Sequence, residues 1–531
     1  MSGPSRVNRT DEERAEDARQ GLAKLICYHN MAPHTICGGA FLDIIRWLNP
    51  NMVPSFKFEI LEHNCLKLYK EEQCIAKESF SKLAGQISLS VDLLVHEKQG
   101  DQYLCLGAQF IDADWKLRKW VIKYCGVSNM NMDLPSEAIL KSLKEYDIET
   151  KILSLTAVGT GGLADTVKEN VQERLKLPMN GQLFHVQCSC DVISRMVKKG
   201  FEEVDEIVDK VQLLGWSKSP PLWNLTSSKL SEALRKFSKK GREKVKRVCK
   251  IADRIYEITK GLFEFKRPTP NLFLPHLQEI RAYLVQESAS SDAFVRLVAL
   301  KMLEILNKYW DDMSLVLSIT AFLDPRYKRN FLEFCLSESC ATTILENIRK
   351  VYDGYAVQCD QKEYLLSDSS TESGEDDDED GDEDEKRSRR HSNKKLRNSR
   401  LKNLNVVKEY LQSVQSMNDE SQWSDLDLYL EEPVLPWMED FSVLHWWKEN
   451  GFKYPQLSRM ARDFLAIPLS VATGSDAYYT ERREADWRLL SLKPELMNAL
   501  KCTRSWKFGY VKSNISSSEA QQDFFAALMR S

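Results

Sequence analysis

The 531-residue sequence has no long apolar run. Its longest candidate, residues 313–323, is interrupted by Ser314, Ser318 and Thr320, and it is shorter than the roughly 20 apolar residues that a membrane-spanning helix needs. A buried helix or strand explains this segment better. The first twenty residues are polar and mixed in charge, without the apolar core of a secretory signal, so we expect synthesis in the cytosol.

The sequence also lacks a disulfide or zinc pattern, although it contains 13 cysteines. In a long intracellular chain, cysteine is most simply a small, reduced and buried residue. The cysteines and histidines that lie closest together are Cys27, His29, His34 and Cys37, and the pair Cys188 and Cys190. Neither group has the paired ligand spacing that closes a zinc tetrahedron. We therefore predict no metal site and no cofactor.

Charge is unevenly distributed along the chain, whose formal net charge is only −4. Between Glu372 and Glu385, eleven of fourteen residues are acidic, so the remainder of the chain carries +7. Residues 365–404 have almost no apolar side chains, and there a basic run follows this acidic run, which predicts a disordered loop. A moderately basic body thus carries an acidic loop.

Hydrophobic periodicity predicts a mixed α/β fold. Three apolar or alternating runs separated by turn residues predict adjacent antiparallel strands over Ile87–Val95, Tyr103–Ile111 and Trp120–Val127. Helical and strand-like segments then alternate, with a helix over 136–145, a strand over 151–156, a helix over 164–175, a strand over 182–187 and a helix near Asp191. This is the element order of a ribonuclease H-like core.

The chain is longer than one compact core usually supports, so we expect several structural units. In chain order they are a disordered N-terminus (1–21), an N-terminal helical region (22–84), the ribonuclease H-like core (85–215), an all-α insertion (216–364), the disordered loop (365–404), a helical C-terminal region that completes the core (405–510) and a tail (511–531). Helical spacing over 229–310 predicts the insertion.

A basic cluster lies at the start of the insertion. Nine of the sixteen residues from Arg235 to Lys250 are Lys or Arg, against the single acid Glu243. A helix there would expose positive charge on most of its circumference, which suits contact with nucleic-acid phosphates. A solvated surface helix explains the cluster equally well. The candidate DNA-binding residues are Arg235, Lys236, Lys239, Lys240, Arg242, Lys244, Lys246 and Arg247.

The order of several motifs resembles that of hAT-superfamily transposases, over roughly Leu22 to Phe508, and especially their domesticated plant members. The motifs are Ile111-Asp-Ala-Asp-Trp-Lys-Leu117, Trp223-Asn-Leu-Thr226, Lys308-Tyr-Trp310, Leu323-Asp-Pro-Arg-Tyr-Lys328, Asp425-Leu-Asp-Leu-Tyr-Leu430, Leu444-His-Trp-Trp447, the run from Tyr454 to Asp463, and Ile467-Pro-Leu-Ser470. Each motif alone is weak, but their order is specific. The resemblance implies a ribonuclease H-like fold and pairing through the C-terminal region.

The resemblance also implies that the cutting chemistry is lost. Transposases of this family use three carboxylates to hold two divalent ions, and the resemblance places them at Asp92, Val158 and Asp476. Valine has no lone pair to give a metal, and the final Glu of the family is shortened to Asp476. The family's Cys-x-x-His pair reads Cys188-Ser-Cys-Asp191.

We therefore predict that the protein is not an enzyme. Asp165 is an alternative second ligand, but an Asp stabilised at the start of a helix is the simpler interpretation of it.

Large apolar residues are concentrated between Leu426 and Leu465, and they suit either a domain core or an interface with Trp and Tyr anchors. Composition alone favours the core, whereas the resemblance implies that the segment also pairs protomers, as a homodimer or with related proteins. The dimerisation candidates are Leu428, Tyr429, Leu430, Trp446, Trp447, Tyr454, Leu457 and Leu465.

Relatives in the family begin with a zinc-binding BED finger that reads DNA, and no Cys or His precedes Leu22 here. We expect either DNA contact through the insertion and core, or a protein-only partner of finger-bearing relatives. The run Lys386-Arg-Ser-Arg-Arg390 with Lys394 and Lys395 resembles a nuclear import signal, so we expect the protein in the nucleus. The neighbouring acidic run suits histone binding, DNA mimicry or simple solubility.

Overall fold

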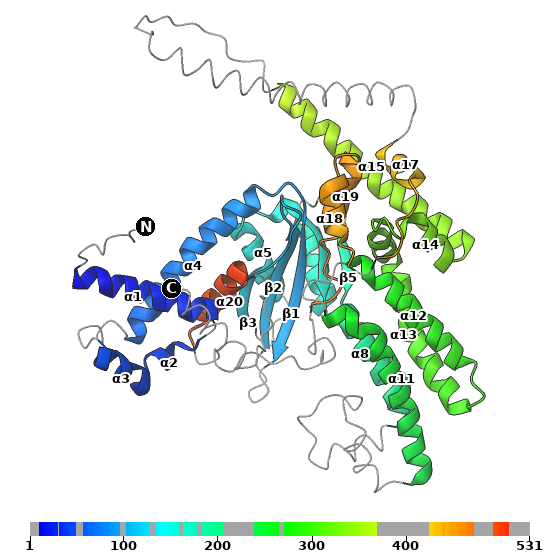
Figure 1. Ribbon diagram of the computed structural model, residues 1–531, viewed down its shortest axis with the longest axis horizontal. Coiled ribbons are helices and arrows are strands. Elements are labelled where there is room, and N and C mark those ends of the chain that lie inside the picture. Colours follow the sequence, from blue (N-terminus) through cyan, green and yellow to red (C-terminus); the bar gives the residue numbers. More distant parts are fainter. Residues whose placement is uncertain are drawn as a thin grey trace, which may run out of the picture.

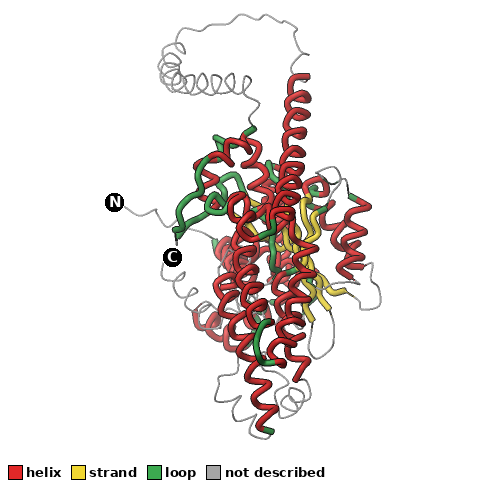
Figure 2. Tube along the Cα trace, turned by 90° about the vertical axis from the view of Figure 1, so that its right-hand side faces the viewer, coloured by secondary structure: helices red, strands yellow, loops and turns green. Residues whose placement is uncertain are grey.

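The computed structural model describes residues 10–29, 31–48, 57–95, 102–127, 134–158, 163–175, 177, 183–204, 238–264, 270–368, 424–438, 440–471 and 492–508. A central sheet lies between two groups of helices (Figure 1), and the view turned by 90° shows helices on either side of the strands (Figure 2). None of the described helices is both long and apolar enough to cross a bilayer.

The sheet has five strands in the order β3-β2-β1-β4-β5. Their bounds are β1 (Ile87–Val95), β2 (Gln102–Ile111), β3 (Leu117–Val127), β4 (Ile152–Ala157) and β5 (Phe184–Gln187). The first three strands pair antiparallel, and β4 and β5 run parallel to β1. This arrangement confirms the predicted mixed α/β fold with a ribonuclease H-like core.

Three helices follow the strands as the periodicity predicts, namely α5 (Leu134–Glu145), α6 (Leu163–Arg174) and α8 (Ser189–Phe201), with single turns η2 (Glu149–Lys151) and η3 (Glu202–Val204). The apolar residues of α5 and α6 pack with Leu89 and Leu155 of the sheet in one buried cluster. A second cluster joins β5 and α8 to the helical region beyond. The two clusters give the sheet an apolar layer on each face.

The N-terminal helices pack beside the edge strand β3. They are α1 (Asp11–His29), α2 (Pro33–Ile36), α3 (Gly39–Leu48) and α4 (Phe58–Ser81), and they are joined by the C-terminal helix α20 (Pro494–Phe508). Two side chains of α20 accept hydrogen bonds from β3, where Val121 N donates to Ser505 Oγ (2.8 Å) and Tyr124 N to Asn498 Oδ1 (2.9 Å). This cover protects the edge of the sheet, and it places α20 of the C-terminal region against the core.

The predicted disordered N-terminus, residues 1–21, is wrong from Asp11 onward because α1 begins there. Thr10 and Glu13 exchange hydrogen bonds, Thr10 N to Glu13 Oε2 (2.7 Å) and Glu13 N to Thr10 Oγ1 (3.2 Å), which is a capping box. Ala15 and Ala23 are buried in the packing of α1 on the neighbouring helices. Tertiary contact and a local cap therefore order a segment whose composition is polar.

The insertion consists of long helices. Its described elements are α11 (Lys239–Glu264), the turn η5 (Pro270–Leu272), α12 (Phe273–Ser288), α13 (Ala293–Phe322), α14 (Lys328–Cys335) and α15 (Glu338–Asp368). Helix α13 approaches α8 so closely that a Cβ at Gly200 would lie 2.1 Å from the Met302 side chain. Residues 216–237 of the predicted insertion lie outside the described residues. Helix α15 extends four residues into the predicted loop, and residues 369–404 lie outside the described residues.

Three short helices follow, α17 (Asp425–Glu431), α18 (Val443–Asn450) and α19 (Pro455–Phe464). Helices α18 and α19 lie between the sheet and the insertion in Figure 1, and α17 packs against α19. Ser424 begins α17 with a capping box to Asp427. Helix α19 contacts β2, α13 and α15, so it joins the two halves of the molecule.

Candidate catalytic and binding sites

The first candidate site is the end of the sheet where β4 finishes beside β1, and we call it the sheet edge. The two strands are parallel, and Val91 pairs with Ala157, so the next residues along, Asp92 and Val158, lie side by side. Asp92 is only 5% exposed, and Val158 is half-buried and packs against the core cluster of the insertion. The structure thus brings together the first two predicted positions. The third, Asp476, lies outside the described residues.

The C-terminal segment that leads toward Asp476 passes over this edge. Thr156 Oγ1 donates a hydrogen bond to Pro468 O (2.7 Å), and Ser189 N donates to Leu469 O (2.8 Å). Both contacts fix the chain across the ends of β4 and β5. Among the described residues, no three His, Cys, Asp or Glu side chains gather as metal ligands.

Cys188 and Cys190 contact each other at the same edge, with 3.0 Å between their sulfur atoms, and both are buried. Cys188 N also donates to Ala157 O at 3.0 Å. These thiols therefore pack where the resemblance places a Cys-x-x-His pair. Asp165, the alternative ligand, is exposed in the first turn of α6, where it faces the positive end of the helix.

The second candidate site is the basic surface of α11, whose N-terminal end extends beyond α12 and α13 (Figure 1). Val245, Val248 and Ile255 of this helix are buried in the core, so the basic side chains lie on its outer faces. Lys239 and Lys240 are exposed in a first turn that has no acidic residue. Because a helix N-terminus is itself positive, this end of α11 favours an anion.

Some of the other basic candidates have intramolecular partners. Lys246 lies 3.2 Å from Glu243, Arg247 pairs with Asp292, and the Lys244 ammonium lies 4.9 Å from the centre of the Phe294 ring. Arg242 is half-buried, and Arg235 and Lys236 lie outside the described residues. The described part of the predicted cluster is therefore helical and basic, with its least constrained charges at the N-terminal end.

The Leu323–Lys328 motif fastens the insertion to the C-terminal region. Asp324 and Arg326 form a buried ion pair (2.7 Å), and Asn271 Nδ2 donates to the same carboxylate (2.7 Å). The Lys328 ammonium donates to Tyr429 O (2.5 Å) and to a second carbonyl of that segment, and burial lowers the pKa of Lys328 to about 8. Lys328 also adopts a φ of 46°, a strained value for a residue with a side chain.

The dimerisation candidates fall into two groups, one with buried side chains and one with half-buried side chains. Trp447 and Tyr429 are fully buried and donate hydrogen bonds to backbone carbonyls at the end of α13, Trp447 Nε1 to Leu323 O (2.9 Å) and Tyr429 OH to Phe322 O (3.0 Å). The buried candidates are Tyr429, Trp447, Tyr454, Leu457 and Leu465, and the half-buried ones are Leu428, Leu430 and Trp446. The buried side chains shape the segment from inside and cannot themselves contact a second protein.

The exposed large apolar side chains in this region are Val434, Trp437, Met438 and Phe452, and none of them is among the dimerisation candidates. Three of them follow or flank Pro433 and Pro436, in a connection between α17 and α18 that has no helix face to bury them. Pro433 and Pro436 were the sequence signal that could have identified this segment as non-helical, and so its large apolar side chains as exposed.

Asp463 is a buried carboxylate that joins three regions. Gln86 N donates to its Oδ1 (2.7 Å) at the start of β1, and the Tyr355 hydroxyl of α15 donates to its Oδ2 (2.9 Å). Burial raises the pKa of Asp463 to about 7, although these hydrogen bonds and Arg462 act in the opposite direction. Sequence reasoning included Asp463 in a motif but gave it no role, because its partners are distant in the chain.

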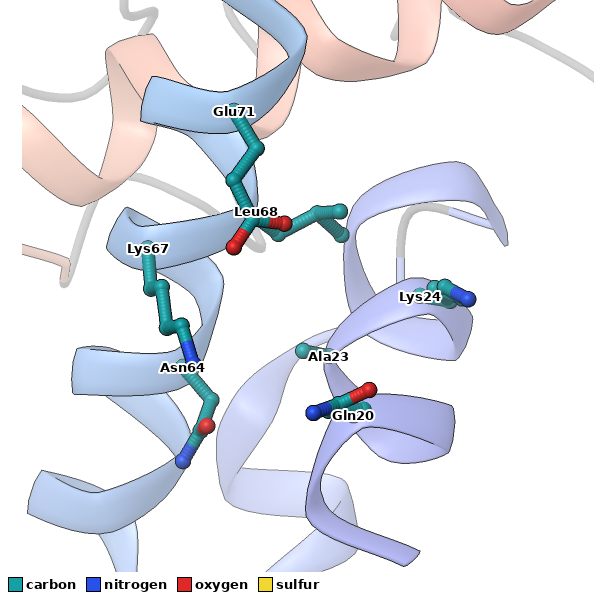
Figure 3. A pocket seen from close by; sticks show the side chains of 7 residues that line it. All are labelled: Gln20, Ala23, Lys24, Asn64, Lys67, Leu68 and Glu71. Atoms are coloured by element: carbon teal, nitrogen blue, oxygen red, sulfur yellow. The ribbon is translucent and has the colours of Figure 1, made fainter. Parts of the chain in front are cut away.

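A small cavity of about 100 Å³ lies between α1 and α4 (Figure 3). It is lined by Gln20, Ala23, Lys24, Asn64, Lys67, Leu68 and Glu71. Small-molecule sites usually have volumes of about 300 Å³ or more and mainly apolar walls. This cavity is smaller and mostly polar, so it is not a candidate ligand site.

Comparisons with known proteins agree with this geometry. Three family models match, the hAT family C-terminal dimerisation region over 425–507, the hAT-like transposase RNase-H fold over 271–359 and the ZBED1 RNase-like domain over 95–183. This chain is a distant member of the hAT transposase-derived proteins. The second model covers η5 to α15, so the helical insertion belongs to the same family architecture as the sheet.

Two plant relatives align over most of the chain. DAYSLEEPER of Arabidopsis thaliana is 27% identical over 97% of this chain and 76% of its own length. RICESLEEPER 2 of Oryza sativa subsp. japonica is 26% identical over 91% of this chain and 73% of its own length. Both relatives are zinc finger BED domain-containing proteins by name. The predicted resemblance to domesticated hAT transposases is confirmed, and the match to the hAT dimerisation region implies that the protein dimerises.

Proposed function

We propose that this hAT transposase-like protein is catalytically inactive and binds DNA or chromatin in the nucleus as a dimer, in a regulatory role. The observation that carries the proposal is Val158, which directly follows β4 and lies beside Asp92 of the parallel strand β1. A two-metal site needs several carboxylate oxygens around ions that together carry four positive charges. An apolar side chain that packs into the core offers no such ligand and raises the cost of placing an ion there.

The basic surface of α11 supports the DNA-binding part of the proposal. Lys239 and Lys240 lie on an end of the helix that projects from the body and has no acidic residue in its first turn. Phosphate contacts supply affinity without sequence choice, and they make binding strongly dependent on salt. We therefore expect DNA retention that weakens steeply as the salt concentration rises.

A mobility-shift assay at two salt concentrations tests this part. In the test variant, glutamine replaces four lysines of α11, Lys239, Lys240, Lys244 and Lys246. The expected result is weaker binding and a shallower salt dependence, by about 0.9 in the logarithmic slope for each phosphate that the variant no longer neutralises.

The matched control replaces four exposed lysines of α1, α4 and α5 with glutamine, Lys24, Lys70, Lys141 and Lys144. It makes the same change in net charge, so it should bind DNA as the wild type does. Equal weakening in both variants would assign binding to net charge and would remove α11 as the DNA-contact surface.

The alternative is a protein-only partner of finger-bearing relatives. It is favoured by the intramolecular pairing of Lys246 and Arg247, which leaves less free charge on α11, and by the match to a dimerisation region. Under this alternative the wild type would form dimers but would not retain DNA at low salt.

A further inference from the structure

Large apolar side chains gather on one exposed surface where α14 meets the connection between α17 and α18. We call this the Trp437 surface and define it by Phe331, Phe334, Val434, Trp437 and Met438. Phe334 is 87% exposed and Trp437 is 68% exposed. Single exposed apolar residues are common on soluble proteins, but neighbouring ones of this size are typical of an interaction site.

Ring contacts through Tyr327 link Phe331 of α14 to Trp437 of the C-terminal region. The Tyr327 ring lies 4.9 Å from the Phe331 ring and 6.5 Å from the Trp437 ring, measured between centroids. Phe334 is on the next turn of α14 after Phe331. The insertion and the C-terminal region therefore both contribute to one surface.

Two further contacts hold the exposed side chain of Trp437 in place. Leu435 N donates to Pro325 O (3.0 Å), and the Arg326 guanidinium lies 4.7 Å from the centre of the Trp437 ring. Arg326 is itself fixed by its buried ion pair with Asp324. A side chain that is already ordered loses little conformational entropy when a partner covers it, which is the usual property of an interface anchor.

The charges around the surface are of both signs. The exposed charges nearest to these residues along the chain are Arg329 and Glu333 on α14, and Glu431 and Glu432 before Val434. Lys453 lies 3.8 Å from Glu432. A DNA backbone would require a positive border, which this is not. A two-fold contact between identical surfaces places each charge opposite a different position of the partner, so a mixed border can be complementary to itself.

We propose that the Trp437 surface is the centre of a two-fold contact between two copies of this chain. Three of its residues, Val434, Trp437 and Met438, lie within residues 425–507, which match the hAT dimerisation region. The inference rests on dimerisation as part of the proposed function and adds which side chains make the contact. It also gives the insertion a part in pairing, through Phe331 and Phe334 of α14.

Light scattering after size-exclusion chromatography, over a range of concentrations, tests the proposal on the full chain. The test variant combines Phe334→Glu and Trp437→Glu, and we expect its dimer dissociation constant to rise at least about 100-fold. The control is Trp47→Glu on α3, an 85% exposed tryptophan outside this surface, which should leave the constant unchanged. Circular dichroism and the melting temperature establish that each variant is folded, and Trp437→Ala alone gives a milder second test.

The outcomes separate this inference from the proposed function. A wild type that dimerises, with a folded double variant of unchanged affinity, overturns the Trp437 surface and leaves dimerisation intact. A wild type that is monomeric at every concentration overturns both. Salt-dependent DNA retention is measured on the same samples, so the DNA-binding part stands or falls separately.

Discussion

The sheet edge and the junction between the insertion and the C-terminal region differ in how their charged side chains are paired. At the edge, Val158 stands beside Asp92 where a metal site would need a second carboxylate. At the junction, Asp324, Arg326 and Lys328 are all buried or nearly so, and each has a hydrogen-bonded partner. The difference is that the buried charges of the junction are all paired, and that Lys328 uses its charge to join the insertion to the C-terminal region.

Removing one member of the buried Asp324–Arg326 pair should cause the largest loss of stability at the junction. Asp324→Ala leaves the Arg326 guanidinium buried without its carboxylate, which typically costs about 3–5 kcal/mol in the free energy of unfolding. Urea unfolding measures the loss. Glu333→Ala removes the exposed partner of Arg329 and should cost less than about 1 kcal/mol. Similar losses in both variants would show that the junction gains no special stability from burial.

The pH dependence of stability tests Asp463, which lies between the two regions. Its pKa is about 7 in the fold, so the native state keeps a proton that the unfolded chain releases near pH 4. The unfolded chain binds fewer protons in this window, and stability should therefore fall as the pH rises from about 4 to 7, by roughly 3–4 kcal/mol from this group.

Asp463→Asn mimics the neutral acid and should flatten that dependence, since Asn can still accept from Gln86 N. Thermal melts of both proteins at matched pH values provide the measurement. An unchanged slope in the variant would assign the dependence to other groups.

Restoring a carboxylate at the sheet edge tests whether Val158 is the residue that prevents metal binding there. Val158→Asp places a charge beside Asp92 and removes apolar packing, so we expect a loss of about 1–3 kcal/mol in the presence of EDTA. Mn²⁺ should recover part of that loss in the variant and have no effect on the wild type. A wild type stabilised equally by Mn²⁺ would mean that Val158 does not prevent metal binding.

Local sequence patterns predicted the strands and the helices that follow them well, because alternation and helical spacing depend on neighbouring residues. The capping box at Thr10 and Glu13 was a local signal too, but the polar composition of the segment concealed it. The contacts of Asp463 and of α20 with β3 could not be predicted this way. Gln86 and Asp463 are 377 residues apart, and no local pattern records such a partner.

The aromatic cluster shows the same limit within the candidate sites. Composition indicated a core or an interface, and the choice for each residue depended on tertiary packing. Trp447 points to the end of α13, whereas Trp437, ten residues earlier, lies over Arg326 at the surface. Sequence reasoning could name the segment but could not assign individual side chains to the core or to the surface.

A nicking assay tests the central claim most directly. Purified wild type and Asp92→Asn are incubated with supercoiled DNA and Mg²⁺ or Mn²⁺, and the relaxed product is quantified against metal alone. We predict no metal-dependent nicking above that background and no difference between the two proteins. Nicking by the wild type that disappears in Asp92→Asn would contradict the claim that the site has lost its chemistry.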